Sequence, residues 1–133
     1  MRSIIVDAGP LVALFRARDE HHQTAKKGLE ASRAILLTTW PVVTEACHFL
    51  QQEGKRALLS FIQRGALRLE PLSDDDVPRL DELLRRYERM DFADATLVVL
   101  GEKTGVADIF TIDRRDFEAY RMRGGRRFRL VLA

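Results

Sequence analysis

The residues with the clearest chemical potential are carboxylates that stand beside short apolar segments far apart in the chain. They are Asp7, Glu45, Asp91, Asp94, Asp113 and Asp116. Two carboxylates ~4 Å apart repel each other by roughly 4 kcal/mol at an effective dielectric constant of ~20, so a fold that gathers them needs a proton or a cation to offset the repulsion. Such oxygen ligands suit Mg²⁺ or Mn²⁺, which can activate water and neutralise charge on a phosphodiester. The acids therefore predict a metal-dependent hydrolytic site, provided that the fold brings them together.

The expected secondary structure decides whether these acids can meet. Apolar runs predict strands at 2–6, 34–38, 66–72, 108–113 and 127–132, of which 66–72 alternates and is expected at an edge. Periodic segments predict helices at 11–18, 20–33, 41–53, 55–63, 73–90 and 93–104, and Gly54 is expected to end the third. This alternation predicts an α/β fold with a mainly parallel central sheet flanked by helices. In such sheets ligands bind outside the carboxyl ends of the strands, where Asp7 and Asp113 stand.

Taken singly, each acid also has an ordinary structural explanation. Asp7 and Asp113 fit turns, and Asp94 fits a helix cap. Glu45 fits the solvent-facing side of an amphipathic helix, although an unpaired charge among its apolar neighbours would be costly. Asp91 shares a helix face with Asp94 if that helix extends back by three residues. The placement of several acids near one sheet edge is what favours a shared site.

Length and composition indicate one globular domain covering residues 1–133. The chain is 46% hydrophobic and 32% charged, which is typical of a folded globular protein. No apolar run approaches the ~18–20 residues of a membrane span, and the N-terminal residues lack the features of a signal peptide, so a cytoplasmic location is expected. Cys47 is the only cysteine, which agrees with a reducing compartment.

An arginine-rich segment lies near the C-terminal end, although the net charge of the chain is only +2. The arginines of this segment are Arg114, Arg115, Arg121, Arg123, Arg126, Arg127 and Arg129. Such a segment suits a phosphate backbone, and it equally suits a solvated surface or a contact with an acidic partner chain.

Four sequence blocks resemble the PIN domain family, and within it the ribonuclease toxins of VapC-type toxin–antitoxin modules. The blocks are IIVDAGPLVALF, VVTEACHFL, MDFADATLVVLGEKTG and IFTIDRRDF. They occur in the family's order and extend over nearly the whole chain, as far as Phe117. The resemblance implies a parallel sheet flanked by helices and a Mg²⁺- or Mn²⁺-dependent endoribonuclease.

The resemblance also implies roles for individual residues. The family's four acids, which are catalytic and metal-binding, correspond to Asp7, Glu45, Asp94 and Asp113. Asp116 occupies a less regular acidic position, and Asp91 is an additional candidate ligand. Thr111 matches a hydroxyl that often precedes the fourth acid. Ala8 and Gly9 stand where the family often has a small hydroxyl residue, so no side-chain hydrogen bond to the first acid is expected from there.

The reaction that the resemblance implies is hydrolysis of an RNA phosphodiester by a metal-activated water, which leaves a 5′-phosphate and a 3′-hydroxyl. The arginines expected to hold the RNA backbone are Arg114, Arg115, Arg126 and Arg127. The expected protein partners are a second copy of the chain and a small cognate antitoxin. The amphipathic helices between residues 41 and 63 are candidate contact surfaces, and packing on the sheet is their alternative role.

Three alternatives remain open at the level of sequence. A PIN-domain nuclease can process RNA without an antitoxin, and a module with the same fold can bind RNA without cleaving it. A phosphoryl-receiving domain also gathers acids at the end of a parallel sheet, but that chemistry usually needs a lysine near the phosphorylated Asp. Lys103 is the only lysine near one of the acidic blocks, and it lies deep in its predicted helix.

Overall fold

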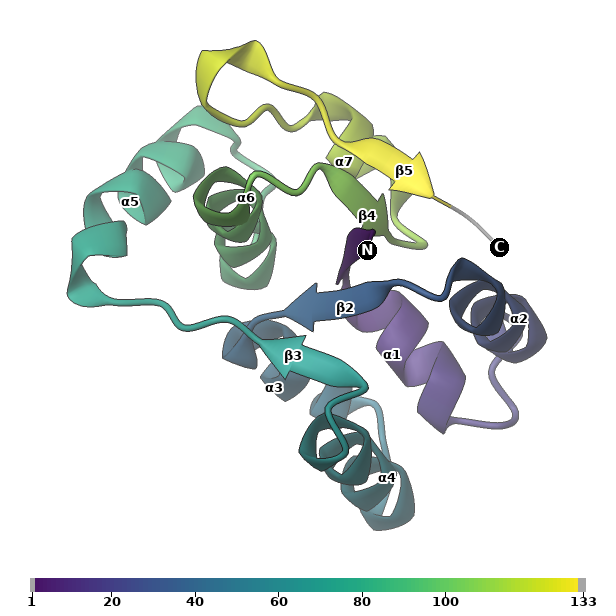
Figure 1. The fold of residues 1–133 in the computed structure, drawn as a ribbon. Helices are drawn as coiled ribbons and strands as arrows, with labels where there is room; N and C mark the ends of the chain where they lie inside the picture. The colour runs from purple at the N-terminus through teal and green to yellow at the C-terminus, as the bar shows by residue number, and fades with distance from the viewer. Residues whose placement is uncertain (1, 132–133) are drawn as a thin grey trace.

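A five-stranded parallel sheet forms the centre of the domain. The computed structural model describes residues 2–131, within which the strands follow the order β3–β2–β1–β4–β5 (Figure 1). Their bounds are Ser3–Val6 (β1), Ile35–Thr38 (β2), Leu67–Leu69 (β3), Asp108–Phe110 (β4) and Arg129–Val131 (β5). Each neighbouring pair is parallel. The predicted α/β fold is confirmed, with β3 at an edge as expected; Leu132, the last residue of the predicted strand 127–132, lies outside the described residues.

Helices surround this sheet and bury its apolar side chains. Within the described part of the chain they are α1 (Ala8–Phe15), α2 (His22–Ser32), α3 (Trp40–His48), α4 (Gln52–Gln63), α5 (Val77–Arg86), α6 (Phe92–Thr104) and α7 (Arg114–Ala119). α1 packs against α2, α3 and α4, whereas α5 packs on α6 (Figure 1). The shared core includes Ile5 of β1, Leu11 of α1, Leu97 of α6 and Ile109 of β4. None of the helices in residues 2–131 is long and apolar enough to cross a membrane.

The topology brings the N-terminal ends of several helices to one edge of the sheet. α1 follows β1, and α3 follows β2, in each case after one residue, so both helices start at the carboxyl ends of their strands. α6 leads back to the start of β4, so its own first turn lies at the same edge. α7 follows the carboxyl end of β4. Acidic side chains are stabilised in such first turns by the helix dipole, which explains locally why this edge carries aspartates.

Several predicted boundaries are corrected by local hydrogen bonds. α1 starts at Ala8 rather than residue 11, because the Asp7 side chain accepts from the Ala8 N–H and caps the helix. β4 ends at Phe110 rather than residue 113, because the Asp113 N–H donates to the Thr111 hydroxyl in a turn. The predicted helix 73–90 consists of a 3₁₀ turn, Asp74–Asp76, followed by α5, and it ends at Arg86.

The prediction that Gly54 ends a helix over 41–53 is wrong. α3 ends at His48, and Gly54 lies inside α4 as a buried residue. A Cβ atom at this position would lie 2.8 Å from the Phe15 carbonyl oxygen and 3.3 Å from Leu50 Cδ2. The glycine therefore serves close packing of α4 on the end of α1, rather than helix termination.

Replacing Gly54 with Ala is expected to destabilise the protein by about 1–2 kcal/mol, because the added methyl group must displace backbone. The sign of this stability change is informative, because a Gly→Ala substitution inside an unconstrained helix stabilises the protein by roughly 1 kcal/mol. Urea unfolding measures the difference. Ser60→Ala, at an exposed position of the same helix, is the control and should change stability by less than about 0.5 kcal/mol. A Gly54→Ala variant as stable as the parent would contradict the packing argument.

Candidate active site

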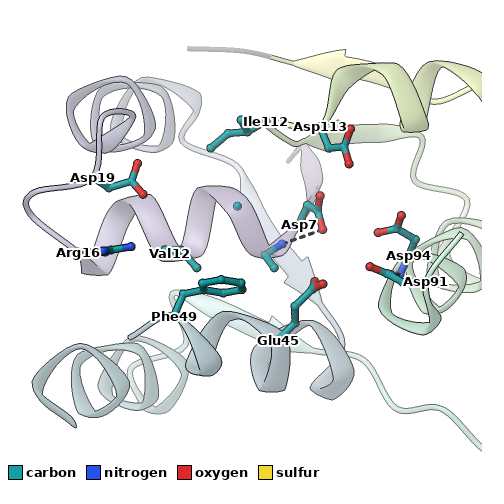
Figure 2. A pocket seen from close by; sticks show the side chains of 12 residues that line it. Asp7, Val12, Arg16, Asp19, Glu45, Phe49, Asp91, Asp94, Ile112 and Asp113 are labelled. Carbon is teal, nitrogen blue, oxygen red and sulfur yellow. Dashed lines mark hydrogen bonds between the residues drawn. The ribbon is translucent and has the colours of Figure 1, made fainter. Parts of the chain in front are cut away.

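A pocket of about 350 Å³ lies at the carboxyl edge of the sheet. Its acidic lining residues are Asp7, Asp19, Glu45, Asp91, Asp94 and Asp113. Figure 2 shows that all of these except Asp19 face a common space, while Asp19 and Arg16 lie at the opposite end, beyond Val12. The structure thus brings together the four acids that match the PIN family and Asp91, the additional candidate ligand named from the sequence. Asp116 is not among the residues that line the pocket.

Asp7 is the most firmly held of these acids. It is 7% exposed and stands between β1 and α1. Its Oδ1 accepts from the Ala8 N–H at 2.8 Å, and its Oδ2 accepts from the Thr111 hydroxyl at 2.8 Å. Burial raises the pKa of Asp7 to about 6, although these two hydrogen bonds act in the opposite direction. Thr111 thus supplies a side-chain hydrogen bond to the first acid where Ala8 and Gly9 supply none.

Asp91 and Asp94 are positioned by the start of α6. Asp91 is the N-cap residue, and its Oδ1 accepts from the Asp94 N–H at 2.8 Å. Asp94 is 7% exposed, and its Oδ2 accepts from the Tyr120 hydroxyl at 2.8 Å. Burial, followed by the charge of Asp7, raises the pKa of Asp94 to about 8. The N-cap residue of α6 is therefore Asp91 and not Asp94. The Asp94 side chain is directed at the pocket instead (Figure 2).

Glu45 and Asp113 complete the acidic group from two other elements. Glu45 projects from α3 and is half-buried, and burial together with the charges of Asp91 and Asp7 raises its pKa. Asp113 precedes α7 and is exposed. Its pKa is raised by partial burial and by Asp116, which lies in the first turn of α7. Asp116 is therefore a neighbour of Asp113 that does not line the pocket.

The donor set fits a divalent cation with a preference for oxygen ligands. Burial opposes ionisation of these carboxylates and they repel one another, so a bound cation would favour their charged forms. Arg16 is the one basic residue that lines the pocket within residues 2–131. In this same part of the chain, no three acidic, His or Cys side chains lie in an arrangement that could by itself hold a metal ion. Mg²⁺ is compatible with such an open arrangement, because it usually takes one or two carboxylates and retains several waters.

The arginines predicted to contact RNA separate into two groups. Arg114 and Arg115 begin α7 directly after Asp113, and both are exposed. Arg126 instead donates to the Gly105 carbonyl oxygen at 2.9 Å, at the end of α6 that is distant from the pocket. The backbone of Arg127 pairs with that of Arg121 in an isolated antiparallel β-bridge, and Arg127 likewise does not line the pocket.

Sequence reasoning missed two residues of the site, Arg16 and Tyr120. Arg16 directly follows α1, and Tyr120 directly follows α7. Nothing in the sequence distinguishes Arg16 from other surface arginines, and Tyr120 reaches Asp94 only through the tertiary fold.

Lys103 has no place in the acidic pocket. Its Nζ donates to Asp76 at 2.9 Å and to the Pro71 carbonyl oxygen at 3.3 Å. It lies in the last turn of α6, whereas Asp94 lies in the first. The lysine that phosphoryl-receiving chemistry usually needs is therefore absent from the pocket lining within residues 2–131.

Comparisons with known proteins agree with this arrangement. The sequence profile of the PIN domain matches residues 4–122. Ribonuclease VapC26 of Mycobacterium tuberculosis is 28% identical over 134 residues, which cover 96% of this chain and 99% of that protein. The crystal structure of Mycobacterium tuberculosis VapC20, described as a sarcin–ricin loop cleaving toxin, superimposes with a TM-score of 0.74 at 29% identity. That match covers 85% of this chain and 93% of the other.

Proposed function

Because this chain belongs to the PIN domain family, we propose that it is a VapC-type ribonuclease that hydrolyses RNA at the acidic pocket with Mg²⁺ or Mn²⁺ as cofactor. Nucleases of this family are generally metal-dependent. The observation that carries the proposal is the common pocket lined by Asp7, Glu45, Asp94 and Asp113, which come from four separate parts of the chain. The proposed reaction leaves a 5′-phosphate and a 3′-hydroxyl.

In the proposed mechanism, each acid has a role that follows from its environment. Asp7 and Asp94 are the buried, hydrogen-bonded acids and are suited to hold the ion in one position. Asp113 is a third ligand, direct or through water. Glu45 is half-buried, and burial together with the charges of Asp91 and Asp7 raises its pKa, so it is suited to accept a proton from the attacking water and to orient it. When bound, the ion activates that water and neutralises charge on the phosphodiester.

Mapping the ends of cleavage products from total RNA tests this function directly. The expected result is a small set of cuts with 5′-phosphate ends, formed with Mg²⁺ or Mn²⁺ and lost with a chelator. Ribosomal RNA is the first substrate to examine, because the similar VapC20 is described as cleaving the sarcin–ricin loop. Absence of cuts under both metals, or identical cutting with a chelator, would contradict the proposal.

Arg16 is proposed to contact a phosphate of the bound RNA, together with Arg114 and Arg115. It lines the acidic pocket at the end opposite Asp94, and no ion pair within 4.0 Å joins it to a carboxylate in residues 2–131. The roles proposed earlier for Arg126 and Arg127 receive no support from the pocket, since both lie away from its lining. They remain candidates only for contacts with more distant RNA.

Replacing Arg16 with Ala is expected to raise KM for RNA about fivefold, which corresponds to about 1 kcal/mol, with little change in kcat. The slope of log affinity against log salt should decrease by about 0.7, as expected for one lost phosphate contact on a single strand. Arg56→Ala, at an exposed position of α4, controls for the change in net charge. Equal effects of the two substitutions would indicate nonspecific attraction rather than a contact at the pocket.

A small antitoxin and a second copy of the chain are the proposed protein partners. The support is exposed apolar surface on α3 and α4, where Trp40 is 55% exposed and Leu59 is 50% exposed. Phe49, between these helices, lines both the acidic pocket and a neighbouring pocket with Phe15 and Leu50. A protein bound over Phe49 would therefore reach the catalytic acids. Light scattering of the purified chain tests the dimer independently of activity.

A further inference from the structure

We infer that Tyr120 is a positioning residue for the metal-binding carboxylate of Asp94, an inference that rests on the function proposed above. The Tyr120 hydroxyl donates to Asp94 Oδ2 at 2.8 Å in a buried environment. Tyr120 is 3% exposed and directly follows α7, whereas Asp94 lies in the first turn of α6. The bond therefore joins two elements that are far apart in the sequence.

The ring of Tyr120 is fixed by its aromatic neighbours. It makes edge-to-face contacts with Tyr87 at 5.2 Å and with Phe117 at 5.1 Å between ring centroids. The Tyr87 hydroxyl oxygen accepts a hydrogen bond from the backbone N–H of Arg121 at 3.0 Å. This bond also restrains the backbone directly after Tyr120. These contacts hold the Tyr120 hydroxyl in one place, so it can define the orientation of the carboxylate that accepts from it.

The two carboxylate oxygens of Asp94 have different surroundings, so one can be held by the protein while the other binds a metal ion. Oδ2 is occupied by Tyr120, and no hydrogen bond within residues 2–131 involves Oδ1. The backbone of Asp94 is held separately, because its N–H donates to Asp91 Oδ1 at 2.8 Å. With backbone and Oδ2 both restrained, Oδ1 is the oxygen presented to the pocket for a metal ion.

A phenol is suited to this task because it donates a hydrogen bond without adding a positive charge. An Arg or Lys partner would neutralise the carboxylate and weaken its attraction for a cation. Thr111 holds Asp7 in the same manner, through a hydroxyl that donates to Oδ2 at 2.8 Å. The two buried acids are thus each oriented by one uncharged hydroxyl, and partners of this kind commonly tune metal affinity.

Replacing Tyr120 with Phe tests the inference, because it removes the hydroxyl and retains the ring. The affinity for Mn²⁺, measured by calorimetry or by the loss of the free-ion EPR signal, is expected to fall about tenfold. The Mn²⁺ concentration needed for half-maximal RNA cleavage should rise by a similar factor, while KM for RNA at saturating Mn²⁺ stays within about twofold of the parent value.

Tyr87→Phe is the matched control, because it removes a partly buried hydroxyl from the same aromatic cluster, and this hydroxyl bonds to a backbone N–H rather than to an acid. It should change Mn²⁺ affinity by less than about twofold. Unchanged Mn²⁺ affinity in the Tyr120→Phe variant, or equal losses in both variants, would overturn the inference. A parent protein that binds Mn²⁺ but leaves RNA intact would contradict the proposed function alone, because the affinity comparison would still decide the role of Tyr120.

Discussion

Asp94→Asn is expected to lower metal-dependent RNA cleavage by on the order of 10³-fold, or about 4 kcal/mol of transition-state stabilisation. The amide has nearly the shape of the carboxylate, and its oxygen can still accept from the Tyr120 hydroxyl, which in the parent donates to Oδ2. That orientation places the amide NH₂ group where Oδ1 would bind the ion. The variant therefore loses both the negative charge and the ligand atom while the surrounding packing is retained.

The same substitution is expected to raise the melting temperature in the absence of divalent ions. Asp94 is buried near Asp7, and burial together with that charge raises its pKa to about 8. Removing the charge therefore relieves an unfavourable interaction in the folded state. Asp75→Asn, at an exposed acid outside the pocket, should change neither property. Cleavage by the Asp94→Asn variant at the parent's rate would show that the assignment of Asp94 is wrong.

The stability of the metal-free protein is expected to fall as the pH rises from about 4 to 8. Burial raises the pKa of Asp7 to about 6 and that of Asp94 to about 8, and the pKa of Glu45 is raised as well. A group with a raised pKa binds more protons in the folded than in the unfolded state, so its contribution is complete below its unfolded pKa and is lost as the pH rises through the folded value. The decrease in melting temperature should be on the order of 5 °C.

Melting curves in a chelator and in saturating Mg²⁺ or Mn²⁺ measure this effect. A bound cation favours the ionised acids, so the metal should restore most of the lost stability, and more at pH 8 than at pH 5. Asp76 and Asp108 have pKa values lowered by Lys103 and Arg129, respectively, so they titrate below this range and do not obscure it. A metal-free melting temperature that is flat or rises from pH 5 to 8 would contradict the argument.

The architecture could be predicted from the sequence because its signals are local. Short apolar runs alternate with periodic segments, and this order identified strands and helices that the structure contains. The boundary errors at α1 and β4 came from local side-chain hydrogen bonds, whereas the error at Gly54 occurred where a tertiary contact determines the local structure. Gly54 resembles a helix terminator in the sequence, but the carbonyl oxygen of Phe15 on another helix explains why a side chain is excluded there.

The candidate site could be predicted in part, because strand ends that share one edge of a parallel sheet must lie near one another. Asp7 and Asp113 followed from that rule, and Glu45 and Asp94 from the expected helix starts near that edge. The roles of all four acids came with the resemblance to PIN domains. That Asp91 caps α6, and that Asp94 is free to face the pocket, became clear only from their hydrogen bonds.

The sequence by itself determined the types of acid, their order and the parallel sheet, since these depend on residue identity and short-range periodicity. Only the tertiary structure decided which neighbours surround each acid. Tyr120 reaches Asp94 from a different helix terminus, Thr111 reaches Asp7 from the position just after β4, and Arg126 lies away from the pocket. The physical reason is that burial and hydrogen bonding arise between segments distant along the chain, so the chemistry of each carboxylate is fixed only when the sheet and helices have packed.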